Sequence, residues 1–200
     1  MFVAIDGVAG AGKTTQADLI LKKCNASGIS CLVSSAYEKD KKSIFDKFVR
    51  DYTLTDNDTA ITFLFQALYC IQQKEVADAL HNTDLIIADR WNVSFLAYHS
   101  MFGELSELGD NFLQKLDNLT FKNTQPDKSI LLDVSPETAY LRYIDREKQK
   151  SAIPIKDMGF FIKTVDFYRK YAQKHNWYII NGEDTPENVH TQMLRVMGIN

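Results

Sequence analysis

Short apolar runs recur along the chain, and longer stretches with helical spacing separate them. The runs cover residues 2–5, 29–33, 85–88, 130–132 and 177–180. Runs of this length, bounded by polar segments, predict buried strands. Strands that alternate with helices predict an α/β fold, in which a parallel sheet is covered by helices on both faces.

The first run leads into a glycine-rich segment, residues 7–14, with the pattern G-x-x-x-x-G-K-[ST]. Such glycines let backbone N–H groups turn around a polyphosphate, a lysine adds a cation, and a threonine hydroxyl can ligate Mg²⁺. A glycine-rich turn without a ligand is the alternative, but the flanking strand and helix favour a phosphate loop. The predicted nucleotide-binding residues are Gly7, Gly10, Ala11, Gly12, Lys13, Thr14 and Thr15.

Composition narrows the class of protein. The 200 residues are 45% hydrophobic and contain no Pro/Gly/Ser-rich linker, so we expect a single domain over residues 1–200. A net charge of −3 argues against a general nucleic-acid or membrane-surface binder. Three cysteines without a C-x-x-C pair suggest neither a disulfide framework nor a zinc site. No apolar run approaches membrane-spanning length, and we expect a cytoplasmic protein.

Aspartates follow three of the predicted strands. Ligands of open α/β sheets bind beyond the carboxyl ends of the strands, which is where Asp6, Asp89 and Asp133 fall. We expect a functional role for Asp6 and Asp89. Asp133 precedes Ser135 and Pro136, a helix-start signal, and a structural role fits it better.

The helix expected over residues 59–80 has two interpretations. Phe65 and Tyr69 are four positions apart and stack along one face, bordered by Gln66 and Gln72, which would suit a wall for a nucleobase. An ordinary core helix is the alternative. The apolar positions expected to face the core are Ile61, Leu64, Phe65, Leu68 and Ile71.

A basic row follows the helix start at Pro136. Arg142, Arg146 and Lys150 recur every four residues and would project from one side of a continuing helix. They could clamp phosphates or form a solvated face. Because Pro154 interrupts helical structure, we expect a lid over the phosphates at about residues 142–156.

Two motifs and several weaker ones resemble those of the thymidylate kinase family, over nearly the whole chain. They are Ile5-Asp6-Gly7, Gly12-Lys13-Thr14-Thr15-Gln16, Asp89-Arg90-Trp91 with Ser94 and Ala97-Tyr98, and Asn181-Gly182 before Pro186-Glu187-Asn188-Val189. The resemblance implies the three-layer, five-stranded P-loop kinase fold. It also implies phosphorylation of dTMP to dTDP, ATP with Mg²⁺ as donor, and a homodimer.

The resemblance also implies roles for single residues. It places Mg²⁺ near Thr14 and Asp89, and the acceptor phosphate on Arg90. Phe65 takes the base-stacking place. The remaining residues that it places at the substrates are Ser94 and Tyr98, beside the base and sugar, and the lid arginines Arg142 and Arg146, as cations for the transferred phosphoryl group.

Three departures from the family pattern concern the acceptor. The chain lacks an acid at Ala9, an R-E-P-G-G-like segment at residues 34–39, and an arginine at Tyr69. Each lost charge-assisted contact costs about 1.5 to 3 kcal/mol. Monophosphate binding therefore weakens unless other residues compensate, the candidates being Tyr37, Lys39, Lys41 and Lys42.

These departures point toward a neighbouring family, the deoxynucleoside kinases. There an acid at the place of Asp6 acts as general base toward the sugar hydroxyl, and a Phe-Gln pair like Phe65-Gln66 holds the base. Residues 152–155 also resemble the end of their lid. Thr15-Gln16 and the motif at residues 89–98 favour the thymidylate kinase interpretation. A third hypothesis is a nucleotide-binding protein that has lost acceptor chemistry.

Overall fold

The computed structural model describes residues 1–55, 57–122, 124–147 and 156–199, and its centre is a five-stranded parallel sheet. The strand order is β2-β3-β1-β4-β5, and every neighbouring pair is parallel. The strands are β1 (Phe2–Asp6), β2 (Cys31–Ser35), β3 (Leu85–Asp89), β4 (Lys128–Asp133) and β5 (Tyr178–Asn181). The predicted α/β fold with five parallel strands is confirmed.

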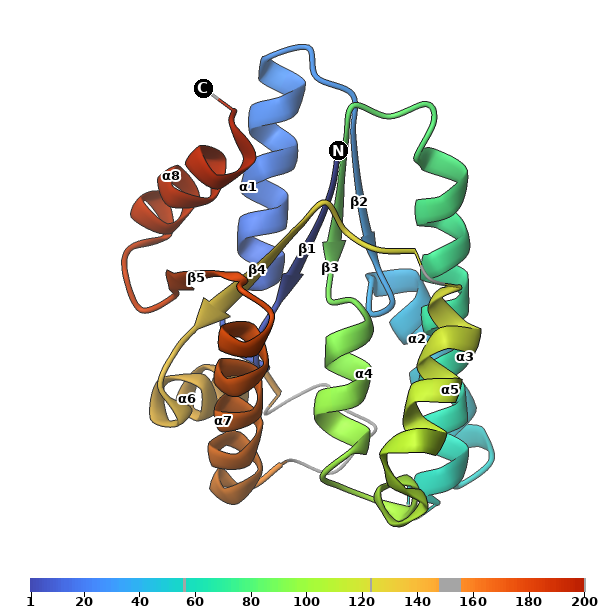
Figure 1. Cartoon of the computed structure of the whole chain (residues 1–200). Coiled ribbons are helices and arrows are strands. Elements are labelled where there is room, and N and C mark those ends of the chain that lie inside the picture. Colours follow the sequence, from blue (N-terminus) through green and yellow to red (C-terminus); the bar gives the residue numbers. More distant parts are fainter. Residues whose placement is uncertain (56, 123, 148–155, 200) are drawn as a thin grey trace.

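Helices connect the strands and cover both faces of the sheet (Figure 1). In Figure 1, α1 and α8 lie on one side and α3 and α5 on the other. No helix in the described ranges is long and apolar enough to cross a membrane. The helices are α1 (Lys13–Ala26), α2 (Lys39–Asp51), α3 (Asp58–Ala79), α4 (Asn92–His99), α5 (Gly109–Phe121), α6 (Pro136–Glu147), α7 (Met158–Lys174) and α8 (Pro186–Met197), with a 3₁₀ helix at Glu104–Leu108.

The two faces of the sheet bury alternate residues of the same strands. Val3 and Ile5 of β1 join a core cluster with α1 and α8, whereas Phe2 and Ala4 join a second cluster with α3, α4 and α5. Because successive side chains of a strand point to opposite faces, a strand covered on both sides is apolar throughout. This explains why β1 and β3 read as continuous apolar runs.

Helix α3 buries most of the face that its apolar spacing predicts, because Ile61 is buried and Leu64, Phe65 and Leu68 are partly buried against it. Ile71, expected in the core, is 47% exposed, and Phe63 is 50% exposed. Three glutamines are buried instead, because each finds a hydrogen-bond acceptor in a neighbouring element. The donors and acceptors are Gln66 Nε2 to Thr120 Oγ1, Gln72 Nε2 to the Ser34 and Arg90 carbonyls, and Gln73 Nε2 to Thr124 Oγ1.

A buried carboxylate lies between α4 and α5. Asp117 is 5% exposed, and its Oδ2 accepts long hydrogen bonds from Asn92 (3.5 Å) and Gln114 (3.4 Å). Burial raises the pKa of Asp117 to about 6, and the two hydrogen bonds oppose this only in part. The folded protein therefore binds this proton more tightly than the unfolded chain does, and stability is lost as the pH rises through about 6.

We predict that Asp117→Asn stabilises the protein at pH 8 by on the order of 1 kcal/mol, and less at pH 5, because the neutral amide carries no desolvated charge. Urea denaturation at both pH values measures the difference. The exposed Asp110 of the same helix supplies the control Asp110→Asn, which should leave the pH dependence unchanged. An equal effect of Asp117→Asn at both pH values would contradict the assignment.

Candidate functional site

A large cavity lies at the carboxyl ends of the strands, where Figure 1 shows the arrowheads. Its volume is about 1530 Å³. It is lined by the glycine-rich loop and α1, the end of β2 with α2, α3, the end of β3, α4, α6, Phe160 of α7 and residues of the segment 182–189. The topology thus brings nearly all the candidate segments of the sequence to one place.

The glycine-rich loop requires glycine at particular positions. Gly7, Gly10 and Gly12 have φ values of 145°, 86° and 98°, which side chains rarely adopt. A Cβ on Gly10 would lie 2.4 Å from the Ala139 carbonyl oxygen, and one on Gly7 would lie 2.6 Å from that of Leu132. The loop therefore packs directly against the backbone of β4 and α6, and its own backbone faces the cavity.

Lys13 begins α1 and is buried, with 5% of its surface exposed. Its Nζ donates to the carbonyl oxygens of Gly7 and Val8, both at 2.9 Å. Burial lowers the pKa of Lys13 well below its usual range, and the nearby Arg90 lowers it further. An anion in the cavity would stabilise the charged ammonium, so the loop, the lysine and the first N–H groups of α1 have the chemistry to bind one.

Two side-chain oxygens of the kind that bind Mg²⁺ lie beside the lysine. Thr14 Oγ1 donates to Asp89 Oδ2 over 2.6 Å, and both residues line the cavity. A hydroxyl and a carboxylate are ligands that Mg²⁺ prefers, usually completed by water and substrate phosphate. The donor set therefore fits the metal that the sequence predicts.

Arg90 is a cation in the part of the cavity near α4 and Tyr37. Its backbone is left-handed, with a φ of 73°. Its Nη1 donates to the Gly7 carbonyl (3.0 Å), to Ser94 Oγ (3.2 Å) and to the Tyr98 hydroxyl (2.9 Å). The guanidinium also lies over the rings of Tyr98 (5.6 Å) and Tyr37 (5.9 Å). A fork held this rigidly suits a phosphate or carboxylate.

Asp6 is fully buried beneath this arginine. Its Oδ1 accepts from Ser94 Oγ (2.6 Å) and the Trp91 N–H (3.4 Å), and its Oδ2 has no hydrogen-bond partner in the described part of the chain. Burial raises the pKa of Asp6, while the bond from Ser94 and the charge of Arg90 oppose the rise. Ser94 also exchanges a 2.7 Å hydrogen bond with the Tyr168 hydroxyl. Asp6 and Ser94 thus support Arg90 from behind.

The aromatic residues of α3 turn to different neighbours. Phe65 stacks on Phe45 (centroids 4.4 Å apart, 19° between planes) and contacts Tyr37 at 5.1 Å. Tyr69 is buried and packs on Phe121 at 5.5 Å, so the two rings do not form the single stacked wall that their spacing suggests. Both nevertheless line the cavity.

Gln66 lies away from that wall. The spacing of the sequence places it beside a base, but its amide donates to Thr120 of α5 and the side chain is 5% exposed. The reason is that a helix turns 100° per residue, so the neighbour of Phe65 faces a different element. The expected contact between Gln66 and a nucleobase finds no support in this geometry.

The arginines of α6 reach the opposite end of the cavity. Arg142 Nη1 donates to the carbonyls of Gly182 (3.1 Å) and Gly10 (3.5 Å), at the edge of the glycine-rich loop. Arg146 lines the cavity, and its guanidinium lies 5.8 Å from the Tyr143 ring. Both therefore lie where a lid cation is expected.

The rest of the predicted lid falls outside the described residues. This applies to Lys150 and to residues 152–155. The chain is described again from Lys156, which lines the cavity with its Nζ 5.5 Å from the Phe160 ring. Phe160 in turn stacks on Tyr98 at 5.5 Å and 4°. The sequence alone does not indicate this pair, since only the fold brings α7 to α4.

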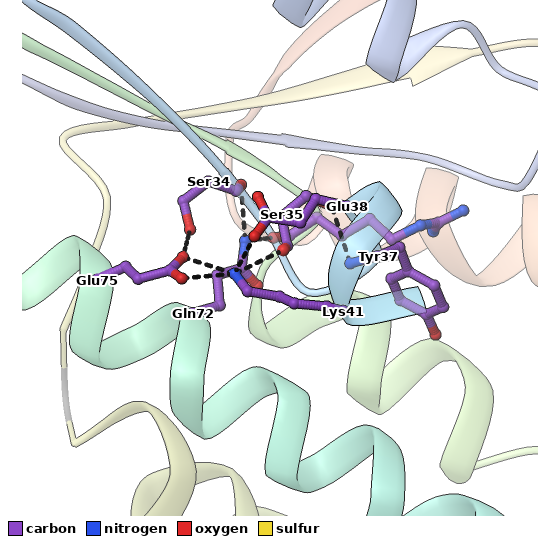
Figure 2. Close-up of polar contacts among 8 residues, drawn as sticks. Ser34, Ser35, Tyr37, Glu38, Lys41, Gln72 and Glu75 are labelled. Carbon is purple, nitrogen blue, oxygen red and sulfur yellow. Dashed lines mark hydrogen bonds and ion pairs between the residues drawn. The ribbon is translucent and has the colours of Figure 1, made fainter. Parts of the chain in front are cut away.

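Lys41, one of the candidates to replace a phosphate-gripping arginine, is already paired. It contacts Glu75 at 2.6 Å and Glu38 at 3.1 Å, and it donates to the Ser35 carbonyl at 3.1 Å (Figure 2). Its side chain is 12% exposed. Lys41 thus binds α2 to β2 and α3, and Tyr37 is the candidate that lies beside Arg90.

Two further charged candidates form ion pairs. Lys42 contacts Asp46 at 2.6 Å along α2. Asp133 accepts from Arg169 Nε of α7 at 2.8 Å, so the structural role preferred for Asp133 agrees with the structure.

Comparison with known proteins agrees with this geometry. The sequence model of the family described as thymidylate kinase matches residues 5–193. A protein of Methanocaldococcus jannaschii named probable thymidylate kinase is 31% identical, and the match covers 97% of this chain and 94% of that protein. The thymidylate kinase of Fervidobacterium nodosum is 28% identical, with 98% of each chain covered. That of Prochlorococcus marinus strain AS9601 is 27% identical, over 98% of this chain and 94% of its own.

We predict that Gly10→Ala weakens ATP binding at least roughly tenfold, because the left-handed backbone and the Ala139 carbonyl both oppose a Cβ and the loop must shift. Gly28→Ala is the matched control: Gly28 has a φ of 69°, but nothing lies within 4 Å of its added Cβ. It should lose stability while ATP affinity stays unchanged. Fluorescence titration measures the ATP affinity of both variants. Unaltered affinity in Gly10→Ala would contradict the loop assignment.

Proposed function

This chain belongs to the thymidylate kinase family, and we propose on that premise that it transfers the γ-phosphoryl group of ATP to the 5′-phosphate of dTMP. The products are ADP and dTDP. One observation carries the proposal: one cavity joins an anion-binding glycine loop to a second pocket built around Arg90 and several aromatic rings. An enzyme that moves a phosphoryl group between two nucleotides needs both pockets on one line.

The donor side is formed by the loop. Backbone N–H groups of residues 10–15 and the Lys13 ammonium bind the phosphates of ATP, and Lys13 exchanges its bonds to the Gly7 and Val8 carbonyls for bonds to phosphate oxygens. Thr14 and Asp89 would hold Mg²⁺, which when bound neutralises charge on those phosphates. Their short mutual hydrogen bond keeps both oxygens at the cavity wall.

The acceptor side is formed by Arg90 and the rings around it. Arg90 binds the monophosphate, and Phe65 offers a flat face to the base. The Tyr69 hydroxyl is buried without a hydrogen-bond partner among the described residues, although its ring lines the cavity. A ligand oxygen or N–H at that position would satisfy it. Tyr69 and Tyr37 thereby take the place of the arginines that the family carries in this region.

Transfer itself depends on position and charge. The transferred phosphoryl group carries negative charge that the protein can stabilise only with cations. Lys13 and the α6 arginines therefore stabilise the transition state. Arg142 already borders the loop through the Gly10 carbonyl. Arg146 and Lys156 extend the same positive end of the cavity. No covalent enzyme intermediate is required.

A nucleoside acceptor is the second candidate, and the orphan Oδ2 of Asp6 favours it. A hydroxyl acceptor needs a general base, and an unpartnered carboxylate oxygen with a raised pKa has that chemistry. Asp6, however, is fully buried behind Arg90 and hydrogen-bonded to Ser94. The monophosphate interpretation uses it as support for Arg90, which its geometry fits better.

We also propose that the protein is a homodimer in the cytoplasm. The exposed face of α3 presents Phe63 and Ile71 together with Ala67 and Cys70, an apolar surface that a second copy would bury. All three cysteines are free, which fits a reducing compartment.

We predict that Mg-ATP and dTMP give ADP and dTDP, that the nucleosides give no turnover, and that Lys13→Ala lowers kcat at least about 100-fold while the fold survives. A coupled ADP-release assay over dTMP, dUMP, dCMP, dGMP, dAMP and the corresponding nucleosides measures this. Turnover of nucleosides alone would establish the deoxynucleoside kinase instead. Binding of ATP without turnover of any acceptor would establish a protein that has lost catalysis, and near-normal turnover by Lys13→Ala would reject the mechanism.

A further inference from the structure

A buried glutamine connects two strand ends at the acceptor side of the cavity. Gln72 lies in α3 and is 0% exposed. Its Nε2 donates to the Ser34 carbonyl of β2 at 3.0 Å and to the Arg90 carbonyl, just beyond β3, at 2.9 Å. Figure 2 shows the Gln72 side chain reaching from α3 to Ser34.

The orientation of the Gln72 amide is fixed by these contacts. Two carbonyl oxygens face it, so the NH₂ group must point toward them and the Oε1 atom away. Oε1 then has no hydrogen-bond partner within the described residues. A buried carbonyl without a donor destabilises the fold. An aliphatic side chain would avoid that cost, but it would leave the Ser34 and Arg90 carbonyls without the donor that Gln72 supplies. Packing alone therefore does not account for a glutamine at this position.

The bridge acts where the regular strand pairing ends. The last paired residues of β2 and β3 are Ser35 and Asp89, and Arg90 then turns into a left-handed conformation with a φ of 73°. This conformation is unfavourable for a residue with a side chain and needs outside support. Gln72 supplies that support by holding the Arg90 carbonyl at a set distance from β2.

The distance matters because the two strand ends carry the two sides of the acceptor pocket. Tyr37 follows β2, and the Arg90 guanidinium lies 5.9 Å from its ring centre. Tyr37 also contacts Phe65 at 5.1 Å. A small shift of β3 relative to β2 would therefore move the Arg90 guanidinium away from both the Tyr37 ring and the stacking face of Phe65.

A neighbouring ionic contact braces β2 but does not reach Arg90. Glu75, one turn after Gln72, accepts from Ser34 Oγ at 2.6 Å and pairs with Lys41 (Figure 2). This contact fixes the end of β2 against α3. Gln72 therefore has a separate task, which is to connect that fixed end to the Arg90 backbone.

We propose that Gln72 is a positioning residue for the acceptor phosphate: its amide bridge between β2 and β3 sets the place of the Arg90 guanidinium relative to Tyr37. The inference rests on the proposed dTMP kinase function. It assigns no contact between Gln72 and substrate. It predicts that loss of the bridge impairs the acceptor half of the cavity and spares the ATP half.

The chain offers a matched control at the next position. Gln73 is also buried in α3, at 4%, and its Nε2 donates to Thr124 Oγ1 at 3.2 Å, away from the cavity. We expect Gln72→Leu to raise the KM for dTMP at least about tenfold with the KM for ATP changed less than about twofold. Gln73→Leu should change neither. Gln72→Glu keeps the shape of the side chain but places a carboxylate oxygen beside the Ser34 and Arg90 carbonyls. It should therefore raise the KM for dTMP as much as Gln72→Leu does.

A double-mutant cycle separates positioning from a general loss of structure. If Gln72 acts through Arg90, Gln72→Leu should add less than about twofold to the KM for dTMP in an Arg90→Lys background. Additive effects, equal effects of the Gln72 and Gln73 variants, or a parallel rise in both KM values would overturn the proposal. Thermal denaturation checks folding, and Gln72→Met replaces Gln72→Leu if the latter fails to fold. Wild-type turnover of dTMP tests the proposed function independently in the same assay.

Discussion

A buried lysine and a half-buried arginine share one backbone carbonyl, and the rest of the site is arranged around that contact. Lys13 Nζ and Arg90 Nη1 both donate to the Gly7 oxygen, at 2.9 and 3.0 Å. A carbonyl carries only a partial negative charge, so it cannot fully compensate two positive groups that have lost much of their hydration. A polyphosphate on one side and a monophosphate on the other would complete the compensation. The parallel sheet makes this possible, because it ends β1 and β3 side by side.

The acceptor half of the cavity differs from the family pattern in carrying tyrosines where the family carries arginines. The Arg90 guanidinium lies over the rings of Tyr37 and Tyr98 and donates to the Tyr98 hydroxyl, while Lys41 is committed to Glu75. Tyrosines bind through directed hydroxyls and flat faces and do not add charge. Binding of the monophosphate therefore depends on the exact place of Arg90, which is why the contacts that hold its backbone and its guanidinium gain importance.

The sequence predicts the fold and the glycine loop well, because both depend on short-range patterns. All five strands lie within two residues of the expected positions, and Lys13, Thr14, Asp89 and Arg90 meet in one cavity. Helix α3 could not be predicted in the same way. Gln66 and Gln72 are buried because α5, β2 and the residue just beyond β3 supply their hydrogen-bond acceptors, and those acceptors lie 18 to 54 residues away in the chain. Apolar spacing carries no information about such partners.

The central claim is that one cavity holds both nucleotides at the same time, the donor at Lys13 and the acceptor at Arg90. Titration calorimetry on the wild-type protein with Mg²⁺ tests it most directly, first with a non-hydrolysable ATP analogue and then with dTMP added to the saturated complex. The account predicts one molecule of each per chain and a dTMP affinity that the analogue does not reduce. Displacement of the analogue by dTMP, or no heat from either ligand, would contradict it.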